Sequence, residues 1–86
     1  MSYDVRLSNT AQRDLTHLPA DLLRRVDAKL ISLSRNPRPR GCMKLRGREG
    51  EGVRVRVGDH RILYTVDDEA RTVAVYRISP RGSAYR

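Results

Sequence analysis

The segment GVRVRVGDHRILY, residues 52–64, constrains the fold more than any other stretch of this chain. Three valines alternate with two arginines over residues 53–57, and a second apolar run opens with Arg61. Successive side chains of a β-strand point to opposite faces of the sheet, so the valines share one face and the arginines the other. Gly58-Asp59 between the two runs is a tight-turn signal. The segment is therefore predicted to form a β-hairpin with one apolar face and one face that carries guanidinium groups.

The rest of the chain predicts helices that cover one face of this sheet. Ser8 or Asn9 is a candidate N-cap for a first helix, and Pro19 ends that helix and opens a second one. The second helix has an apolar face of helical period and is predicted to end before Asn36-Pro37. The predicted order is strand, helix, helix and three strands, over residues 3–7, about 8–18, about 19–35, 53–57, 61–67 and 71–79. This is a single α+β domain over residues 1–86, in which an N-terminal strand and a two-helix hairpin precede a three-stranded antiparallel meander.

Two stretches have a less regular pattern. Residues 37–52, PRPRGCMKLRGREGEG, are basic and rich in glycine, so they are predicted to be a connection with Met43 and Leu45 as its anchors. In the last strand, two alternating sets are apolar enough to face the core: Val73 with Val75, or Ala74 with Tyr76 and Ile78. The sequence leaves the facing of that strand open.

The uncovered face of the sheet is predicted to be basic. If the apolar side chains of the hairpin face the helices, the hairpin arginines all lie on the other side. These residues are Arg54, Arg56 and Arg61. A salt bridge from Arg61 to Asp59, or to an acidic residue of the helices, is the alternative to a functional role for that side chain.

Charge is the strongest signal in the composition. The chain has 18 basic and 10 acidic residues, a net charge of +8, and only Lys29 and Lys44 among the basic residues are not arginine. A guanidinium makes bidentate hydrogen bonds to phosphate that the ammonium group of lysine cannot match. This charge predicts a polyanionic partner, either nucleic acid or an acidic protein, and the arginine content favours nucleic acid. A merely solubilising surface would mix lysine and arginine more evenly.

Neither metal chemistry nor a membrane location is predicted. No cluster of His, Cys or carboxylate residues has the spacing of metal ligands, and no cofactor is expected. His60 lies at the turn and His17 near the end of the first helix, and a structural role is expected for both. The single Cys42 fits a reducing compartment, and the N-terminus lacks the apolar stretch of a signal peptide. A cytoplasmic protein is therefore expected.

Several of these motifs occur together in one known family. They are KLRG at residues 44–47, the arginine-rich strand, GDHRILYTVDDEARTVAVYRIS and the closing PRGSAYR. With a helix hairpin that ends in NPRP, they cover nearly the whole chain. The pattern G-D-x-R, two hydrophobic residues and Y, then an acidic turn and a C-terminal R-x3-Y, is specific in combination. On these residues the chain resembles the RelE/ParE toxin superfamily.

The resemblance implies a toxin of a bacterial type II toxin–antitoxin system. Members of RelE type cut messenger RNA in the ribosomal A site without a metal, by attack of the RNA 2′-hydroxyl on the adjacent phosphate. The expected partners are mRNA, the ribosome and a cognate acidic antitoxin of RelB type that neutralises the basic chain. The toxin is expected to be monomeric when free and to form a hetero-oligomer with its antitoxin.

The resemblance also assigns roles to single residues. Catalytic roles fall on Arg61, Arg81 and Tyr85, and RNA contacts on Arg54, Arg56, Lys44 and Arg46. Tyr85 could carry a proton, stack on a base or pack structurally, and stacking is favoured because aromatic rings commonly hold bases that are not paired. A guanidinium is always protonated, and Pro80 stands where many relatives have a histidine, so no general base is assigned.

Two other functions are consistent with the same fold. ParE-type members poison DNA gyrase and are not nucleases, and the missing base favours this alternative. A toxin relative that has lost its activity and serves as a protein-binding domain is the third possibility. Comparing translation with DNA supercoiling after induction separates the first two.

Overall fold

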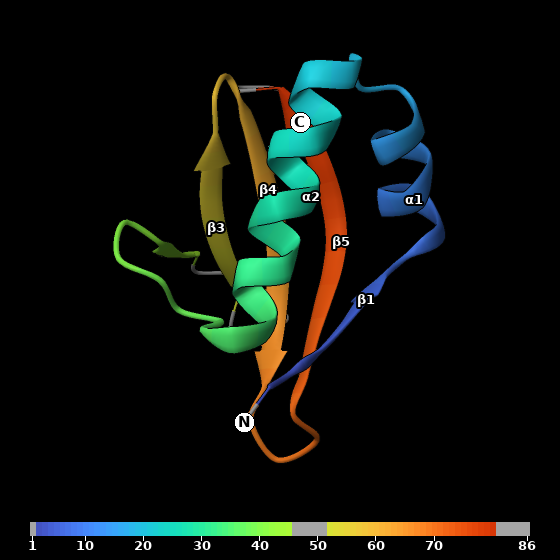
Figure 1. Cartoon of the computed structure of the whole chain (residues 1–86). Coiled ribbons are helices and arrows are strands. Elements are labelled where there is room, and N and C mark those ends of the chain that lie inside the picture. The colour runs from blue at the N-terminus through green and yellow to red at the C-terminus, as the bar shows by residue number, and fades with distance from the viewer. Residues whose placement is uncertain (1, 46–51, 81–86) are drawn as a thin grey trace.

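The structure is a computed structural model that describes residues 2–45 and 52–80. Two helices lie on one face of a five-stranded sheet (Figure 1). In chain order the elements are β1 (Asp4–Leu7), α1 (Asn9–Thr16), α2 (Ala20–Arg35), β2 (Met43–Leu45), β3 (Gly52–Val57), β4 (His60–Asp67) and β5 (Thr72–Pro80). The predicted α+β class is confirmed, with a helix hairpin before an antiparallel meander of β3, β4 and β5.

The first helix begins at a side-chain cap and ends at a tight turn. The Ser8 hydroxyl accepts a hydrogen bond from the backbone N–H of Ala11 at 3.0 Å. α1 ends at Thr16, slightly before the predicted end near Leu18. The backbone N–H of His17 bonds three residues back rather than four, which tightens the last turn before α2 begins.

The second helix lies across the sheet and supplies the helical side of the core together with Ala11 of α1 (Figure 1). Its buried stripe is Val26, Leu30 and Leu33, none of them more than 7% exposed. The helix ends at Arg35 as predicted, because the residue before a proline disfavours helical backbone. The sheet side of the core is Val53, Val55, Val57, Ile62, Tyr64, Val73, Val75 and Ile78. Neither helix of the described residues has the length and apolar character needed to cross a membrane.

The two edge strands of the sheet were not fully predicted. The strand order is β1-β5-β4-β3-β2. β1 runs parallel to β5, so the sheet is mixed rather than wholly antiparallel. β2 lies in the stretch predicted to be a connection, and it pairs antiparallel with the first half of β3. Backbone pairing with β3 makes it a strand, because three alternating residues in a glycine-rich stretch are too few to predict one.

A β-bulge in β5 decides which residues of the last strand are buried. The register between β4 and β5 shifts by one at Leu63/Tyr64, and Tyr76 is the extra residue in β5. Tyr76 and the following Arg77 therefore both point out of the core. The buried apolar residues are Val73, Val75 and Ile78, which belong to both of the sets considered from sequence.

α1 covers the part of the β5 edge that does not pair with β1. The backbone N–H of Ser8 donates to the Val75 carbonyl at 2.9 Å, and the Ser8 hydroxyl to the Tyr76 carbonyl at 3.4 Å. The Asp14 carboxylate accepts a hydrogen bond from the backbone N–H of Ile78 at 2.9 Å. These contacts provide hydrogen-bond partners for backbone N–H and C=O groups at this edge of β5.

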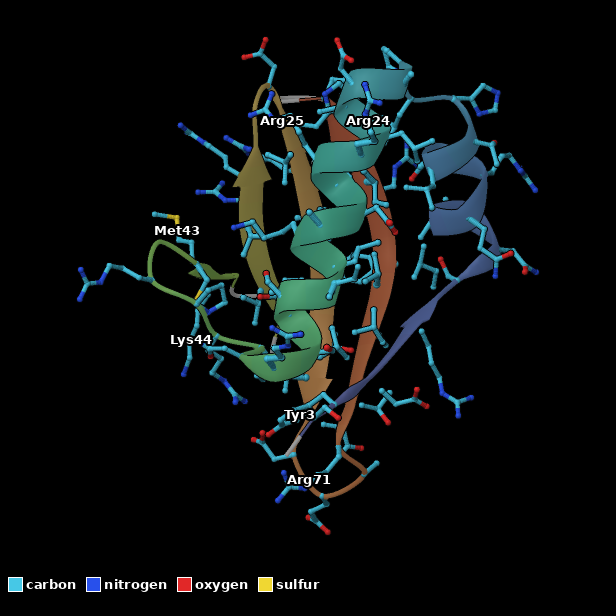
Figure 2. All side chains as sticks on the ribbon, viewed as in Figure 1. Tyr3, Arg24, Arg25, Met43, Lys44 and Arg71 are labelled. Carbon is cyan, nitrogen blue, oxygen red and sulfur yellow. The ribbon has the colours of Figure 1, made fainter. Side chains whose placement is uncertain are left out.

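The turn between β3 and β4 requires its glycine. Gly58 has φ of +59°, a conformation that side chains disfavour. The guanidinium of Arg25 on α2 lies against this turn, near the upper end of the molecule in Figure 2. A Cβ added at Gly58 would lie 3.2 Å from Arg25 Nη1. Backbone conformation and helix contact thus fix the turn that joins the two arginine-bearing strands.

Candidate nucleic-acid interface

The face of the sheet opposite the two helices, here called the open face, carries arginines on three adjacent strands. Directly paired residues share a face, so the register groups their side chains into rows. One row contains Met43, Arg54, Leu63 and Arg77, and the next contains Arg56, Arg61 and Ser79. The valines that alternate with these arginines in β3 are buried on the opposite face. Arg54, Arg56 and Arg61 therefore lie on the open face, as the alternation predicted.

Arg56 and Arg61 form the centre of this face. They lie directly opposite each other on β3 and β4, a position in which like charges are destabilising. Arg61 is also only 8% exposed, and burial of a charge costs free energy that must be compensated. The register places two guanidinium groups side by side, as a site for an anion requires.

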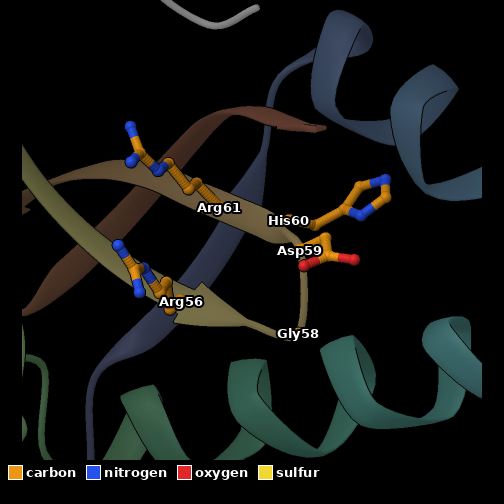
Figure 3. Close-up of a pocket in the computed structure, with 5 residues that line it drawn as sticks. All are labelled: Arg56, Gly58, Asp59, His60 and Arg61. Atoms are coloured by element: carbon orange, nitrogen blue, oxygen red, sulfur yellow. The ribbon is translucent and has the colours of Figure 1, made fainter. Parts of the chain in front are cut away.

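A small pocket lies between these two arginines and the hairpin turn (Figure 3). Gly58, Asp59 and His60 form the rest of its wall. Arg56 and Arg61 extend in the same direction, whereas His60 points elsewhere (Figure 3). Asp59 is exposed and forms no ion pair within the described part of the chain, so it does not provide the competing salt bridge to Arg61.

Ser79 adds a hydroxyl group to the row of Arg56 and Arg61. It lies directly opposite Arg61 on β5 and is 1% exposed. Its Oγ is buried and has no hydrogen-bond partner among the residues that the structure describes, which is unusual for a buried hydroxyl. Only the register reveals this residue, because a serine near the end of a strand has no distinctive sequence pattern. Two guanidinium groups and a hydroxyl in one row are all donors, and they suit an oxyanion.

The guanidinium of Arg54 is oriented by the edge strand. Arg54 Nη2 lies 2.6 Å from the Met43 sulfur, which accepts its hydrogen bond. Met43 was predicted to anchor the connection, yet its side chain is 54% exposed and lies on the open face. The contact therefore positions a charged group at the surface instead of packing in the core.

The other predicted site residues do not join this cluster in the described structure. Lys44 pairs with Val53, whose side chain faces the helices, so its register position is on the helix-covered side of the sheet. The structure thus separates Lys44 from the open-face arginines with which it was grouped. Arg46, Arg81 and Tyr85 lie outside the described residues.

Arg77 is a further open-face arginine that the sequence analysis did not single out. The bulge turns it outward, and its Nε lies 3.4 Å from a carboxylate oxygen of Asp14. A signal for it does exist: two polar surface residues, Tyr76-Arg77, stand side by side between two buried ones and break the strand alternation.

His60 does not belong to the arginine row. It pairs with Val57 on the helix side of the sheet and so faces away from Arg61. Its Nδ1 is buried and has no hydrogen-bond partner in the described part of the chain. Over residues 2–45 and 52–80, no group of three His, Cys, Asp or Glu side chains is arranged to hold a metal ion. The described site is therefore built from guanidinium and hydroxyl donors.

The sequence and the fold have known relatives. The sequence model of the family described as "ParE toxin of type II toxin-antitoxin system, parDE" matches residues 5–85. Toxin RelG of Mycobacterium tuberculosis is 39% identical over 87 residues, which cover 100% of this chain and 99% of RelG.

Two solved toxin–antitoxin complexes contain similar chains. One is the RelBE2 complex of Mycobacterium tuberculosis, with a TM-score of 0.82 and 38% identity over 94% of this chain and 100% of the other. The second is the RelE–RelB complex of the archaeon Pyrococcus horikoshii, with a TM-score of 0.85 and 30% identity over 96% of this chain and 99% of the other. Since the family match extends from β1 to the C-terminal residues, the chain belongs to the RelE/ParE family of toxins of type II toxin–antitoxin systems.

Proposed function

We propose that this toxin is a ribosome-dependent endoribonuclease that cuts messenger RNA in the A site and so inhibits translation. The observation that carries the proposal is the row of Arg56, Arg61 and Ser79, three donors held together on the open face. A solvated basic surface would not bury Arg61 opposite another arginine. Similarity to toxins named RelG and RelE supports the same function.

The proposed reaction is an internal transfer at phosphorus. The RNA 2′-oxygen forms a bond to the adjacent phosphorus, and the bond to the 5′-oxygen of the next nucleotide breaks. The 2′-hydroxyl loses its proton and the departing 5′-oxygen gains one, which leaves a 2′,3′-cyclic phosphate and a free 5′-hydroxyl. Negative charge grows on the phosphate oxygens in the transition state, and Arg56 and Arg61 stabilise it.

The arginines and the C-terminal tyrosine have different proposed roles in this reaction. A guanidinium cannot accept a proton at neutral pH, so the arginines act through their field, which makes the 2′-hydroxyl more acidic. Arg81 is proposed to bind the same phosphate as Arg56 and Arg61, and Tyr85 is proposed to stack on a base. Positive charge that a metal ion supplies in other nucleases comes from guanidinium groups in this mechanism.

The ribosome supplies the geometry of attack. The 2′-oxygen, the phosphorus and the 5′-oxygen must lie nearly in line, an arrangement that free RNA rarely adopts. Holding reactants in that arrangement accounts for a large part of catalysis in many systems. The toxin is therefore expected to cut a ribosome-bound message and to be nearly inert on naked RNA.

An antitoxin is the second proposed partner. The two similar complexes named above each pair a toxin with its antitoxin, which supports a cognate antitoxin for this chain. A net charge of +8 favours an acidic antitoxin segment, because opposite charges steer the encounter and compete with RNA for the arginines. An acidic segment across the open face would block the site directly.

Primer extension on a translated message after induction tests the proposal. The wild type is expected to produce cuts at fixed codon positions, and Arg61→Ala to reduce single-turnover cleavage by about a hundredfold or more. Arg24→Ala is the matched control, since it removes one exposed arginine from α2 and leaves the sheet intact. Intact messages with wild-type toxin on translating ribosomes would refute the nuclease function.

Gyrase inhibition is the competing function, because the matched family carries the ParE name. In that case induction would leave messages intact and reduce DNA supercoiling. The same induced culture, followed for both readouts, decides between the two targets.

A further inference from the structure

Arg77 lies on the open face because of the bulge in β5. A regular register would place it opposite Ile62, whose side chain is in the core, but the extra residue Tyr76 shifts it opposite Leu63. The Arg77 side chain is 45% exposed. Bulges often re-aim side chains next to functional sites. The bulge therefore brings an accessible cation onto the face that carries the proposed phosphate site.

One carboxylate of α1 holds this guanidinium from the side. Arg77 Nε lies 3.4 Å from Asp14 Oδ2, and the same oxygen accepts the backbone N–H of Ile78 at 2.9 Å. A guanidinium has five N–H donors, and only Nε faces this carboxylate. Within residues 2–45 and 52–80, neither terminal NH2 group of Arg77 has an acceptor. The fork of the guanidinium is therefore oriented and available for a ligand.

The register places Arg77 one row away from the proposed phosphate site. It pairs with Leu63, two residues along β4 from Arg61, so the two rows lie about 6–7 Å apart at the usual rise of a strand. Successive phosphates of an extended RNA strand are separated by a similar distance. Two adjacent phosphates can therefore be held at once, the scissile one by Arg56 and Arg61 and its neighbour by Arg77.

A purely structural ion pair is the alternative explanation of Arg77. Exposed ion pairs contribute little to stability, and the Asp14 carboxylate already has a hydrogen-bond donor in the Ile78 N–H. Arg24 is an ordinary arginine of this structural kind, since it is exposed on α2 and pairs with Asp21 at 2.9 Å. The ion pair alone does not account for a bulge that turns Arg77 toward the other arginines.

We propose that Arg77 binds the phosphate next to the scissile phosphate of the message. The inference rests on the proposed function and deepens it, since it adds a second phosphate subsite on β5 to the one at Arg56 and Arg61. Contacts to phosphate position a nucleic acid without reading its sequence. The second subsite therefore sets the register of the message on the sheet and leaves codon preference to other contacts.

The salt dependence of RNA binding tests the second subsite. The probe is a single-stranded decanucleotide with 2′-fluoro riboses, which have no hydroxyl that could attack a phosphate. Arg77→Ala is expected to bind it about tenfold more weakly at low salt. The slope of log affinity against log salt should fall by about 0.7, the value for one phosphate of a single strand. Arg77→Lys keeps the charge and should retain the slope.

Two further variants make the test specific. Arg24→Ala is the matched control, because it also removes one exposed arginine that pairs with one carboxylate, and it should keep the wild-type slope. Arg56→Ala combined with Arg77→Ala should lose about twice the slope of either single variant, because the two side chains meet different phosphates. A double variant with the slope of Arg56→Ala alone would place both side chains on one phosphate and refute the second subsite.

Other results would also refute it. An unchanged slope in Arg77→Ala, or equal losses in Arg77→Ala and Arg24→Ala, would show that Arg77 meets no phosphate. A slope lost equally in Arg77→Lys and Arg77→Ala would indicate a disturbed fold instead of a lost charge. Weaker antitoxin binding by Arg77→Ala with an unchanged RNA slope would assign the side chain to the protein partner.

The result is separable from the fate of the proposed function, because the probe cannot be cut. A slope that depends on Arg77, in a wild-type toxin that leaves ribosome-bound messages intact, would refute the nuclease and retain the phosphate subsite. Normal cleavage of ribosome-bound messages and a normal slope in Arg77→Ala would retain the nuclease and refute the subsite.

Discussion

Arg56 and Arg61 illustrate at the residue scale how function opposes stability in this protein. They are the facing pair at the centre of the open face, and no ion pair to Arg56 forms within the described residues. Relief of like-charge repulsion predicts that Arg56→Ala raises the free energy of unfolding by about 0.2–1 kcal/mol. The same variant is expected to bind RNA more weakly and to reduce the salt dependence of binding by roughly one counterion. Urea unfolding and a salt titration of RNA binding measure the two effects.

Arg24→Ala is the control for this residue-scale prediction. It lowers the net charge by the same amount, but Arg24 is exposed on α2 and pairs with Asp21 at 2.9 Å. It is expected to leave the salt slope nearly unchanged and to alter stability by less than about 0.5 kcal/mol. If both variants reduce the slope equally, the effect comes from overall charge and Arg56 does not meet a phosphate.

At the scale of elements, α1 matters because it holds the bulged half of β5. The Asp14 carboxylate accepts a hydrogen bond from the Ile78 N–H at 2.9 Å and lies 3.4 Å from Arg77 Nε. One carboxylate of α1 therefore contacts both the backbone of β5 and an arginine of the open face. Asp14→Ala is expected to cost about 1–3 kcal/mol of stability, because it leaves a strand N–H without its charged acceptor. It should also weaken RNA binding, since Arg77 on the open face loses the carboxylate that positions it. Asp21→Ala, which removes an exposed carboxylate of α2, is the control, and equal losses in both variants would contradict the role assigned to Asp14.

The same elements show which parts of the fold can be predicted from the sequence. The end of α2 at Arg35 and the hairpin around Gly58 were predicted, because a proline and a glycine turn are local signals. β2 was missed because its pairing with β3 is a tertiary contact in a glycine-rich stretch. Lys44 was grouped with the arginines, but the register of β2 places it opposite Val53, and no local pattern reveals such a register. The bulge at Tyr76 was not predicted, because both alternating sets of the last strand are apolar enough to face the core.

At the scale of the whole molecule, a polar cluster fastens the end away from the hairpin turn. Asp68, in the turn between β4 and β5, receives two hydrogen bonds from Arg38, at 3.1 and 3.0 Å, and one from the Tyr3 hydroxyl at 2.6 Å. The Arg71 guanidinium lies 5.7 Å from the centre of the Tyr3 ring, and Figure 2 shows both residues at the lower end. The start of β1, the segment after α2 and the last turn of the sheet are thereby joined.

This cluster predicts a loss of stability at both ends of the pH scale. Hydrogen bonds from Arg38, then from Tyr3, lower the pKa of Asp68, so its contribution is present above the unfolded value of about 3.9 and is lost as pH falls through the lower folded value. The hydrogen bond to Asp68, with some desolvation, raises the pKa of Tyr3. The contribution of Tyr3 is therefore full below about pH 10 and is lost as pH rises through the higher folded value. Thermal unfolding across pH should show both declines in the wild type and shallower ones in Asp68→Asn. Glu69→Gln, which neutralises the next residue of the same exposed turn, should keep the wild-type profile, and a profile identical in all three proteins would contradict the coupling.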